Sequence, residues 1–184
     1  MKCVILAGGF GTRLSEETIV KPKPLVEIGG KPIIWHIMKI YSHHGINDFI
    51  ICCGYKGYLI KEYFANYLRQ NSDISVDLKK GSIDYFNSPT EDWKVTLIDT
   101  GPESLTGGRL LRVKPFLEME ENFCFTYGDG VGDIDITSSI NYHKKHGKIA
   151  TMTGAVPPGR FGAIKTLGEK AIKFREKLLG YSNH

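Results

Sequence analysis

The sequence predicts an α/β fold, in which a mixed, mostly parallel β-sheet is flanked by helices. Short apolar segments alternate with amphipathic segments of helical period, which is the pattern of strands joined by crossover helices. Two of the apolar segments end directly in glycines, and parallel sheets bind ligands beyond the carboxyl ends of such strands. The length of 184 residues fits one domain and leaves no room for a second full one.

The first predicted strand and helix frame a glycine-rich stretch. Residues 2–7 are apolar and run into glycines, which indicates a buried strand. A helix is expected over residues 32–44, where large apolar side chains recur at helical spacing. Pro32 suits the first turn of this helix and Gly45 suits its end.

The middle of the chain repeats the alternation. An apolar strand is expected over residues 49–53, and a second helix over 58–68 with its apolar side chains on one side. Residues 95–98 are strand-like, and 105–116 can hold a short helix after a pair of glycines. The loops after these strands would lie at the same edge of the sheet as the first glycine-rich loop.

The last third contains the remaining expected elements. Another apolar strand, 123–127, ends in Gly-Asp-Gly, and a third helix over 135–146 has cations in its last turn, where they complement the helix dipole. The expected elements after that helix are a strand over 150–156 and a hairpin of 163–165 and 171–175 around Gly168.

Composition excludes several classes of function. The net charge is +4 and no long run of lysine and arginine occurs, so nucleic acid is not an expected partner. No apolar run approaches the roughly 18 residues of a membrane span, and the apolar stretch near the N-terminus is too short for a signal-peptide core. We expect a cytoplasmic protein with no membrane partner, whose four cysteines are buried and reduced.

The loop after the first predicted strand carries three glycines followed by Arg13. Glycines let backbone N–H groups approach a phosphate or a base edge, and arginine adds a charged fork. A dinucleotide-binding fingerprint is excluded because Leu14 stands where its third glycine belongs. A P-loop is excluded because Gly30-Lys31 is followed by Pro32 rather than by serine or threonine.

A lysine between two prolines follows this loop. Pro22 and Pro24 restrict the backbone on both sides of Lys23. This restriction can hold the lysine side chain in one direction. A solvated turn is the alternative interpretation of the segment taken by itself.

Together these segments resemble the signature of the sugar-1-phosphate nucleotidyltransferases, Gly8-Gly9-x-Gly11-Thr12-Arg13-Leu14 followed by Pro22-Lys23-Pro24. Longer stretches are similar to one branch of that family, the glucose-1-phosphate cytidylyltransferases. These stretches are Leu14-Ser15-Glu16-Glu17-Thr18, Ile33-Ile34-Trp35-His36-Ile37-Met38, Cys53-Gly54-Tyr55-Lys56-Gly57, Thr106-Gly107-Gly108-Arg109-Leu110 and Thr126-Tyr127-Gly128-Asp129-Gly130.

The resemblance extends from Met1 to about Lys177. The family reads Glu-Lys-Pro where this chain has Glu176-Lys177-Leu178, and residues 178–184 match no family pattern. We therefore expect a nucleotidyltransferase domain over 1–177 with a Rossmann-like fold that is incomplete at its C-terminus, followed by a divergent tail. The part absent relative to the family would supply a second metal-binding aspartate and part of the sugar pocket.

The resemblance implies transfer of a cytidylyl group from CTP to glucose 1-phosphate, giving CDP-glucose and pyrophosphate for the dideoxysugars of surface polysaccharides such as lipopolysaccharide O-antigen. It also implies Mg²⁺ as cofactor, and a homo-oligomer in full-length relatives. A uridylyl- or thymidylyl-transferase of the same family and a non-catalytic nucleotide-binding fragment remain alternatives.

The resemblance also implies roles for individual residues. Lys23 and Arg13 would be catalytic, with Lys23 between the α-phosphate and the attacking phosphate and Arg13 beside the β- and γ-phosphates. Asp129 would hold Mg²⁺. The residues implied to bind nucleotide or sugar phosphate are Leu6, Ala7, Gly8, Gly9, Phe10, Gly11, Thr12, Arg13, Lys23, Ser104, Arg109, Gly128 and Lys177.

Several of these residues also have an interpretation without a role in binding or catalysis. Arg109 could be a solvated helix residue, and Asp129 a plain turn residue. Asp133 and Asp135 are expected to begin and cap the next helix. The pair His143-x-x-His146 is expected to be solvated rather than to bind zinc, because no third ligand lies near it in the sequence.

Overall fold

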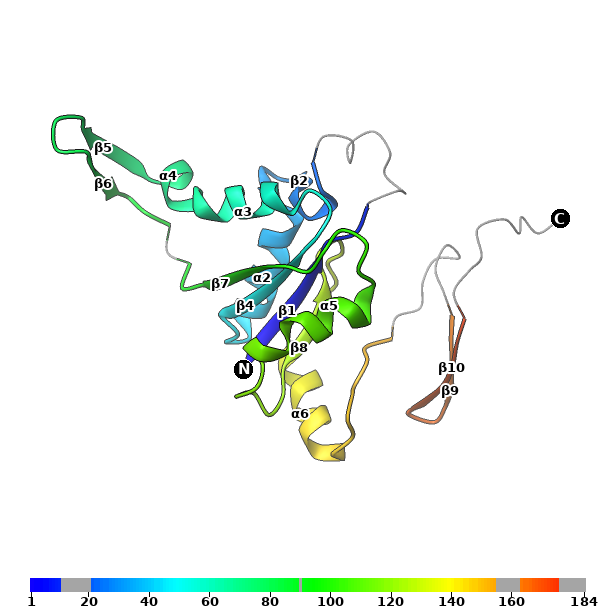
Figure 1. The fold of residues 1–184 in the computed structure, drawn as a ribbon. Coiled ribbons are helices and arrows are strands. Elements are labelled where there is room, and N and C mark those ends of the chain that lie inside the picture. The colour runs from blue at the N-terminus through cyan, green and yellow to red at the C-terminus, as the bar shows by residue number, and fades with distance from the viewer. Residues whose placement is uncertain (11–20, 90, 155–162, 176–184) are drawn as a thin grey trace. The chain divides into compact units, whose positions relative to one another are not determined.

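The structure of the protein is a computed structural model (Figure 1). The chain forms two compact units, Met1–Ile134 and Asp135–His184. The expected domain boundary at 177 lies outside the described residues. The structure describes residues 1–10, 21–89, 91–154 and 163–175.

A four-stranded parallel sheet forms the centre of the first unit. It confirms the predicted α/β class and the strands expected at these four places. The strands alternate with helices along the chain, as the apolar segments predicted. In the order in which they lie side by side, the strands are β7 (Lys94–Asp99), β4 (Asp48–Cys53), β1 (Lys2–Ala7) and β8 (Cys124–Tyr127).

The strand order places a topological switch point at β1. From β1 the chain first builds outward through β4 and β7, and then returns to add β8 on the other side of β1. Leu6 lies opposite Tyr127 and Ala7 lies opposite Cys53, so the ends of β1, β4 and β8 meet at one edge. Open parallel sheets bind ligands in the crevice outside such an edge.

Helices cover both faces of this sheet (Figure 1). On one face, Val4, Leu6, Ile50 and Cys52 form a buried cluster with Val113 of α5. On the opposite face of β1 and β4, alternate side chains are also fully buried, as a sheet covered on both sides requires. Among the described residues of the first unit, the helices are α2 (Ile33–His43), α3 (Gly57–Ala65), α4 (Tyr67–Asn71) and α5 (Thr106–Val113), with short 3₁₀ turns η1 (Lys23–Leu25) and η2 (Lys114–Phe116).

Three features of the first unit differ from the sequence-based expectations. The helix expected over 58–68 is divided into α3 and α4 at Asn66, whose backbone (φ −98°, ψ 5°) leaves the helical geometry. Two antiparallel hairpins were not predicted. They are β2 (Glu27–Ile28) with β3 (Lys31–Pro32), and β5 (Asp73–Asp77) with β6 (Ser82–Phe86).

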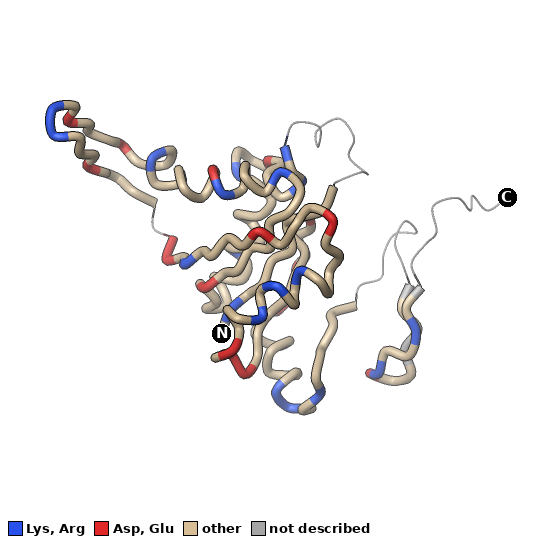
Figure 2. Tube along the Cα trace, viewed as in Figure 1, with Lys and Arg blue, Asp and Glu red and all other residues tan. Residues whose placement is uncertain are grey.

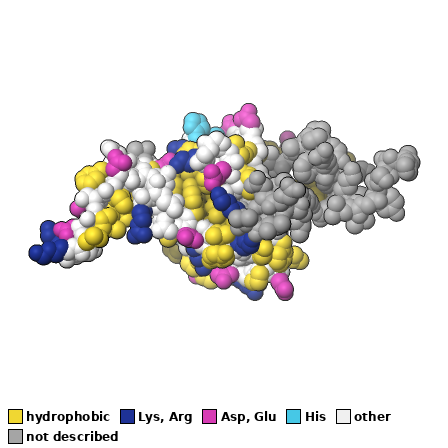
Figure 3. All heavy atoms as spheres, turned by 90° about the horizontal axis from the view of Figure 1, so that it is seen from above, with side chains coloured by type: hydrophobic (Ala, Val, Ile, Leu, Met, Phe, Trp, Pro, Cys, Tyr) yellow, Lys and Arg dark blue, Asp and Glu magenta, His cyan; other side chains and the backbone are white. Residues whose placement is uncertain are grey.

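The β5–β6 hairpin extends away from the central sheet (Figure 1). Lys79 and Lys80 form its tip, which is the blue end in Figure 2. Behind that tip, Figure 3 shows apolar side chains on its surface, of which Ile74 and Val76 are each more than two-fifths exposed.

The described part of the second unit contains one helix and one hairpin. The helix α6 (Ile136–His146) begins at Asp135, whose carboxylate accepts a hydrogen bond of 2.8 Å from the Ser138 amide; this confirms the predicted cap. The predicted hairpin is confirmed as β9 (Ala163–Leu167) and β10 (Lys170–Arg175). The predicted strand over 150–156 is wrong at 150–154, because no backbone pairs with these residues in the described part of the chain; positions 155 and 156 lie outside it.

The cysteines give a first prediction. Burial raises the pKa of the Cys52 and Cys53 thiols to about 11, because desolvation disfavours the thiolate. Cys3 is also buried, whereas Cys124 is half-buried. At about pH 8, a disulfide reagent should therefore modify no more than one thiol per folded chain quickly, and all four after unfolding in guanidinium. Rapid modification of two or more thiols in the folded protein would contradict this account.

Candidate active site

The candidate site lies where β1 and β8 end. After β8, the Gly128 amide donates a 2.8 Å hydrogen bond to the Leu6 carbonyl. A Cβ atom at this glycine would lie 2.9 Å from that oxygen and 3.3 Å from Pro24 Cγ. The absent side chain thus lets the segment after β8 pack directly on β1 and on the segment that carries Lys23.

Lys23 is held by the two prolines that flank it. Pro22 and Pro24 are both buried, so the backbone on each side of the lysine is anchored in the protein. The turn η1 closes with hydrogen bonds from Leu25 to Pro22 (2.8 Å) and from Val26 to Lys23 (3.0 Å). The lysine therefore projects from an anchored turn rather than from a solvated loop.

This packing brings Lys23 to Asp129. The Lys23 Nζ atom lies 3.3 Å from Asp129 Oδ2, although the residues are 106 positions apart in sequence. The lysine side chain is 20% exposed and the aspartate side chain 43% exposed. A cation and a carboxylate thus stand together at the switch point, both accessible from solvent.

The described residues around Asp129 fit a hard divalent cation that also binds a ligand. No group of three or more His, Cys, Asp or Glu side chains able to hold a metal occurs within the residues the structure describes. Mg²⁺ is commonly held by one or two carboxylates together with substrate phosphate oxygens and water. A single exposed carboxylate beside the glycine-rich loop is compatible with that mode of binding.

Arg109 lies beneath the glycine-rich loop rather than on the surface. Its side chain is only 4% exposed, so the alternative interpretation as a solvated helix residue is wrong. Its Nη2 donates to the Gly8 carbonyl (2.8 Å), and its Nη1 donates to the Cys53 carbonyl (3.2 Å) and the Thr100 hydroxyl (2.7 Å). The guanidinium thereby links the loops that follow β1, β4 and β7.

Burial disfavours the charged form of the Arg109 guanidinium, because it removes the guanidinium from water. Burial lowers the pKa of its guanidinium, and the neighbouring Arg112 lowers the pKa further, while Asp99 raises it. Arg112 donates through Nη1 to the Ser104 hydroxyl and to the Thr100 carbonyl. Ser104 lies in the loop after β7, as the sequence placed it, whereas Arg109 lies on α5. The Ser104 hydroxyl contacts Arg112.

The glycine-rich loop is described only in its first part. Leu6, Ala7 and Gly8 are buried, whereas Gly9 and Phe10 are exposed. The Phe10 ring lies against the ring of Tyr55, with centroids 5.3 Å apart. The site residues that lie outside the described part of the chain are Gly11, Thr12, Arg13 and Lys177.

Sequence reasoning missed three residues that shape this edge of the sheet, Gly54, Tyr55 and Thr100. Gly54 and Tyr55 stand inside a stretch quoted for the family resemblance, directly after β4. Their position at the carboxyl end of a predicted strand could have indicated that they lie at the site. Thr100 gave no signal, because its role depends on a contact with a helix residue nine positions away.

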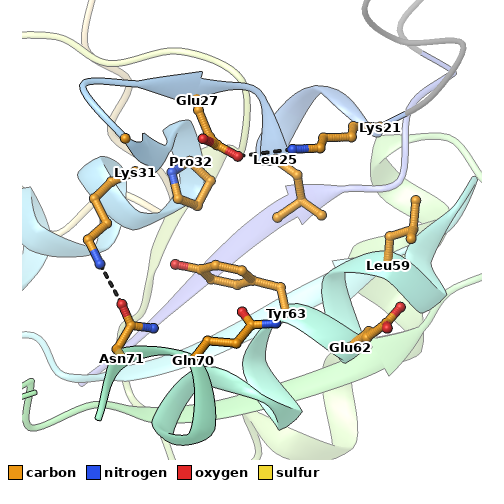
Figure 4. A pocket seen from close by; sticks show the side chains of 11 residues that line it. Lys21, Leu25, Glu27, Lys31, Pro32, Leu59, Glu62, Tyr63, Gln70 and Asn71 are labelled. Carbon is orange, nitrogen blue, oxygen red and sulfur yellow. Dashed lines mark hydrogen bonds and ion pairs between the residues drawn. The ribbon is translucent and has the colours of Figure 1, made fainter. Parts of the chain in front are cut away.

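A separate cavity of about 390 Å³ lies beside this site (Figure 4). Two polar contacts border it, from Lys21 to Glu27 (2.9 Å) and from Lys31 to Asn71 (2.7 Å). The Tyr63 hydroxyl points toward the side of the cavity where Lys31 and Asn71 lie, and it has no hydrogen-bond partner among the described residues. The cavity opens between the β2–β3 hairpin and helices α3 and α4, and the sequence gave no indication of it.

A second prediction follows from the close packing at Gly54. A Cβ atom there would lie 2.7 Å from the Gly8 carbonyl oxygen and 2.8 Å from Arg109 Nη2. We expect Gly54→Ala to lower the free energy of unfolding by about 1–3 kcal/mol, the usual cost of overpacking. Gly107→Ala is the control, because it places a methyl group in open space on a helix and should stabilise the protein. Chemical denaturation measures both, and equal stabilities of the two variants would contradict the packing argument.

Comparison with known proteins places this geometry in a family. A family model described as nucleotidyl transferase matches residues 2–177. The chain is 61% identical over 180 residues to glucose-1-phosphate cytidylyltransferase of Salmonella typhimurium, covering 98% of this chain and 70% of that protein. It is 46% identical over 177 residues to probable glucose-1-phosphate cytidylyltransferase of Bacillus subtilis, covering 96% of this chain and 69% of that protein.

A solved structure shows the same fold. The crystal structure of UDP-glucose pyrophosphorylase complexed with UDP-glucose matches with a TM-score of 0.64 at 18% identity, over 96% of this chain and 68% of that one. This chain belongs to the nucleotidyl transferase family, on the branch of the glucose-1-phosphate cytidylyltransferases.

Proposed function

We propose that this protein transfers the cytidylyl group of CTP to glucose 1-phosphate, giving CDP-glucose and pyrophosphate. The observation that carries the proposal is the Lys23–Asp129 pair at the switch point of a parallel sheet. The identity of 61% to a glucose-1-phosphate cytidylyltransferase supports the choice of substrates. The chain spans 70% of the length of that relative.

The chemistry requires positioning and charge rather than a general base. A phosphate oxygen of glucose 1-phosphate attacks the α-phosphorus of CTP, and the bond to the pyrophosphate oxygen breaks. The attacking phosphate monoester is already mostly ionised near neutral pH, so no proton must be removed from it. Two anions must instead be brought together while negative charge grows on the leaving group, which calls for cations placed in advance.

We assign these tasks to the residues that the sequence singled out. Lys23 would lie between the α-phosphate and the attacking phosphate, with Arg13 beside the β- and γ-phosphates. Asp129 would hold Mg²⁺, which when bound neutralises phosphate charge. The stretch 6–10 would hold cytosine and ribose. The remaining proposed contacts are Gly11 and Thr12 to the phosphates, Ser104, Arg109 and Gly128 to the nucleotide, and Lys177 to the sugar phosphate.

We extend the proposal to the setting of the enzyme on the resemblance alone. The product would enter dideoxysugar synthesis for surface polysaccharides such as lipopolysaccharide O-antigen, the transferase domain would comprise 1–177, and the protein would be a cytoplasmic homo-oligomer. Among the described residues, no helix has the length and apolar character needed to cross a bilayer.

Release of pyrophosphate tests the proposed reaction. With Mg²⁺ and glucose 1-phosphate, the purified protein should release pyrophosphate faster with CTP than with UTP or dTTP, and CDP-glucose should form in equal amount. Faster release with UTP or dTTP would move the protein to a uridylyl- or thymidylyl-transferase. Binding of CTP without any release of pyrophosphate would leave a non-catalytic nucleotide-binding protein.

Thermal stability gives a third prediction. CTP with Mg²⁺ should raise the melting temperature more than ATP or GTP does, because a ligand that binds only the folded state stabilises it by mass action. At a concentration 100 times Kd the stabilisation is about 2.7 kcal/mol. Differential scanning fluorimetry measures the shifts. Equal shifts from CTP, ATP and GTP would indicate a phosphate site without selectivity for cytosine.

A further inference from the structure

We propose that Thr100 is a positioning residue of the nucleotide site, which acts through Arg109 on the peptide between Gly8 and Gly9. This inference rests on the proposed function, because it concerns the glycine-rich loop of the same site. Thr100 itself is 0% exposed and lies immediately after β7 (Lys94–Asp99). It therefore cannot touch a nucleotide, and it can affect binding only through another residue.

The Thr100 hydroxyl fixes the Arg109 guanidinium. The hydroxyl donates a 2.6 Å hydrogen bond to the Cys53 carbonyl and accepts a 2.7 Å hydrogen bond from Arg109 Nη1. The same Nη1 also donates to the carbonyls of Cys53 (3.2 Å) and Gly101 (2.8 Å). Since the single hydroxyl proton is directed at Cys53, the lone pairs of the oxygen face the guanidinium, and both groups have one orientation.

The guanidinium in turn orients one peptide of the loop. Arg109 Nη2 donates a 2.8 Å hydrogen bond to the Gly8 carbonyl, which also accepts from the Tyr55 amide at 3.3 Å. No cis peptide bond occurs in the described chain, and in a planar trans peptide the C=O and the following N–H point in opposite directions. With the Gly8 oxygen directed inward to Arg109, the Gly9 N–H is directed outward.

The surroundings of the two glycines agree with this orientation. Gly9 is exposed, and no atom of the described residues lies within 4 Å of a Cβ atom placed on it. Gly8 is buried, and a Cβ atom placed on it would overlap the guanidinium, with Nη2 at 2.8 Å. The peptide therefore presents to the open side an N–H donor whose direction is set before any ligand arrives. Acceptors of the kind that cytosine and phosphate carry would meet that donor without reorganisation of the loop.

Removal of the Thr100 hydroxyl should loosen this arrangement. Thr100→Val retains the shape of the side chain but leaves the guanidinium without one acceptor and the Cys53 carbonyl without one donor. We expect KM for CTP to rise about tenfold, the usual effect of losing a hydrogen bond to a charged group. KM for glucose 1-phosphate should change less than twofold, because the Thr100 hydroxyl contacts Cys53 and Arg109, neither of which is assigned to the sugar phosphate. Thr100→Ser retains the hydroxyl and should restore KM for CTP.

Thr96→Val is the matched control, because Thr96 lies half-buried on β7 outside this network. The control should keep both KM values. A rise of both KM values in Thr100→Val, or a fall in melting temperature with neither KM changed, would show a merely structural role and overturn the proposal. If Thr100→Val does not fold, Gly8→Ala tests the same link from the opposite side, because its methyl group displaces the guanidinium; an unchanged KM for CTP in that variant would also overturn the proposal.

A measurement without substrates separates this inference from the proposed function. The Gly9 amide signal in a ¹⁵N–¹H spectrum, identified by its loss in Gly9→Ala, should shift in Thr100→Val and stay in place in Thr96→Val and Thr100→Ser. A fixed Gly9 signal in Thr100→Val would overturn the positioning role even in an active enzyme. A shifted signal in a protein that releases no pyrophosphate would support the positioning link while refuting the proposed reaction.

Discussion

Replacement of Lys23 by alanine is expected to lower kcat by about 10²-fold or more, the typical effect of removing one contact that stabilises developing charge. The lysine projects from a turn anchored by two buried prolines, so its ammonium needs little ordering when phosphates bind. Its ion pair with Asp129 is partly exposed, and such pairs contribute little to stability. The melting temperature of Lys23→Ala should therefore stay close to that of the wild type while turnover is lost.

Lys21→Ala is the matched control for this experiment. Lys21 is half-exposed and pairs with Glu27 at 2.9 Å, away from Asp129. Its loss should leave kcat unchanged. Lys23→Arg adds a test of geometry, because a planar guanidinium keeps the charge but not the compact shape of the ammonium, and it should recover only part of the activity. Equal losses in the Lys21 and Lys23 variants, or full activity of Lys23→Ala, would remove Lys23 from the chemistry.

The central sheet could be predicted from the sequence because each of its strands carries its own local signal. The strand β4, for example, is a continuous apolar run that lies between two helices, and burial on both faces of a parallel sheet requires such runs. The β5–β6 hairpin also had a signal that was missed. Ile74 and Val76 alternate with polar residues and pair with Tyr85 and Ile83, a period of two that is typical of strands.

The interior of the site could not be predicted in the same way. The buried guanidinium of Arg109 is held by carbonyls at or just after the ends of three separate strands, and no local sequence pattern reports such a contact. Its sequence neighbours on α5 include two glycines and an exposed leucine, which gave no reason to expect a buried charge. Likewise, the distance between Lys23 and Asp129 depends on the packing of Pro24 against Gly128, which only the folded sheet brings about.

Replacement of Asp129 by asparagine is expected to raise the Mg²⁺ concentration that the enzyme needs for turnover. The substitution preserves the size of the side chain but removes the carboxylate charge that a hard cation prefers. We expect the Mg²⁺ concentration that gives half of the maximal rate to rise by about tenfold or more, and kcat to fall by about 10²-fold. Affinity for CTP in the absence of metal should stay the same or increase, because Lys23 loses its carboxylate partner and the phosphates meet one negative charge fewer.

Asp133→Asn separates a specific effect from a general change in surface charge. Asp133 is exposed and lies four residues after Asp129, where it lines an open depression beside α2, so its loss should leave the Mg²⁺ dependence unchanged. Titration of the initial rate with Mg²⁺ and calorimetry with CTP in a chelating buffer provide the two readouts. A rise in the Mg²⁺ requirement without weaker binding of metal-free CTP would mean that Asp129 serves the metal, with the nucleotide held by other groups. An Asp129→Asn protein with the Mg²⁺ dependence of the wild type would place the cation elsewhere and leave Asp129 only as the partner of Lys23.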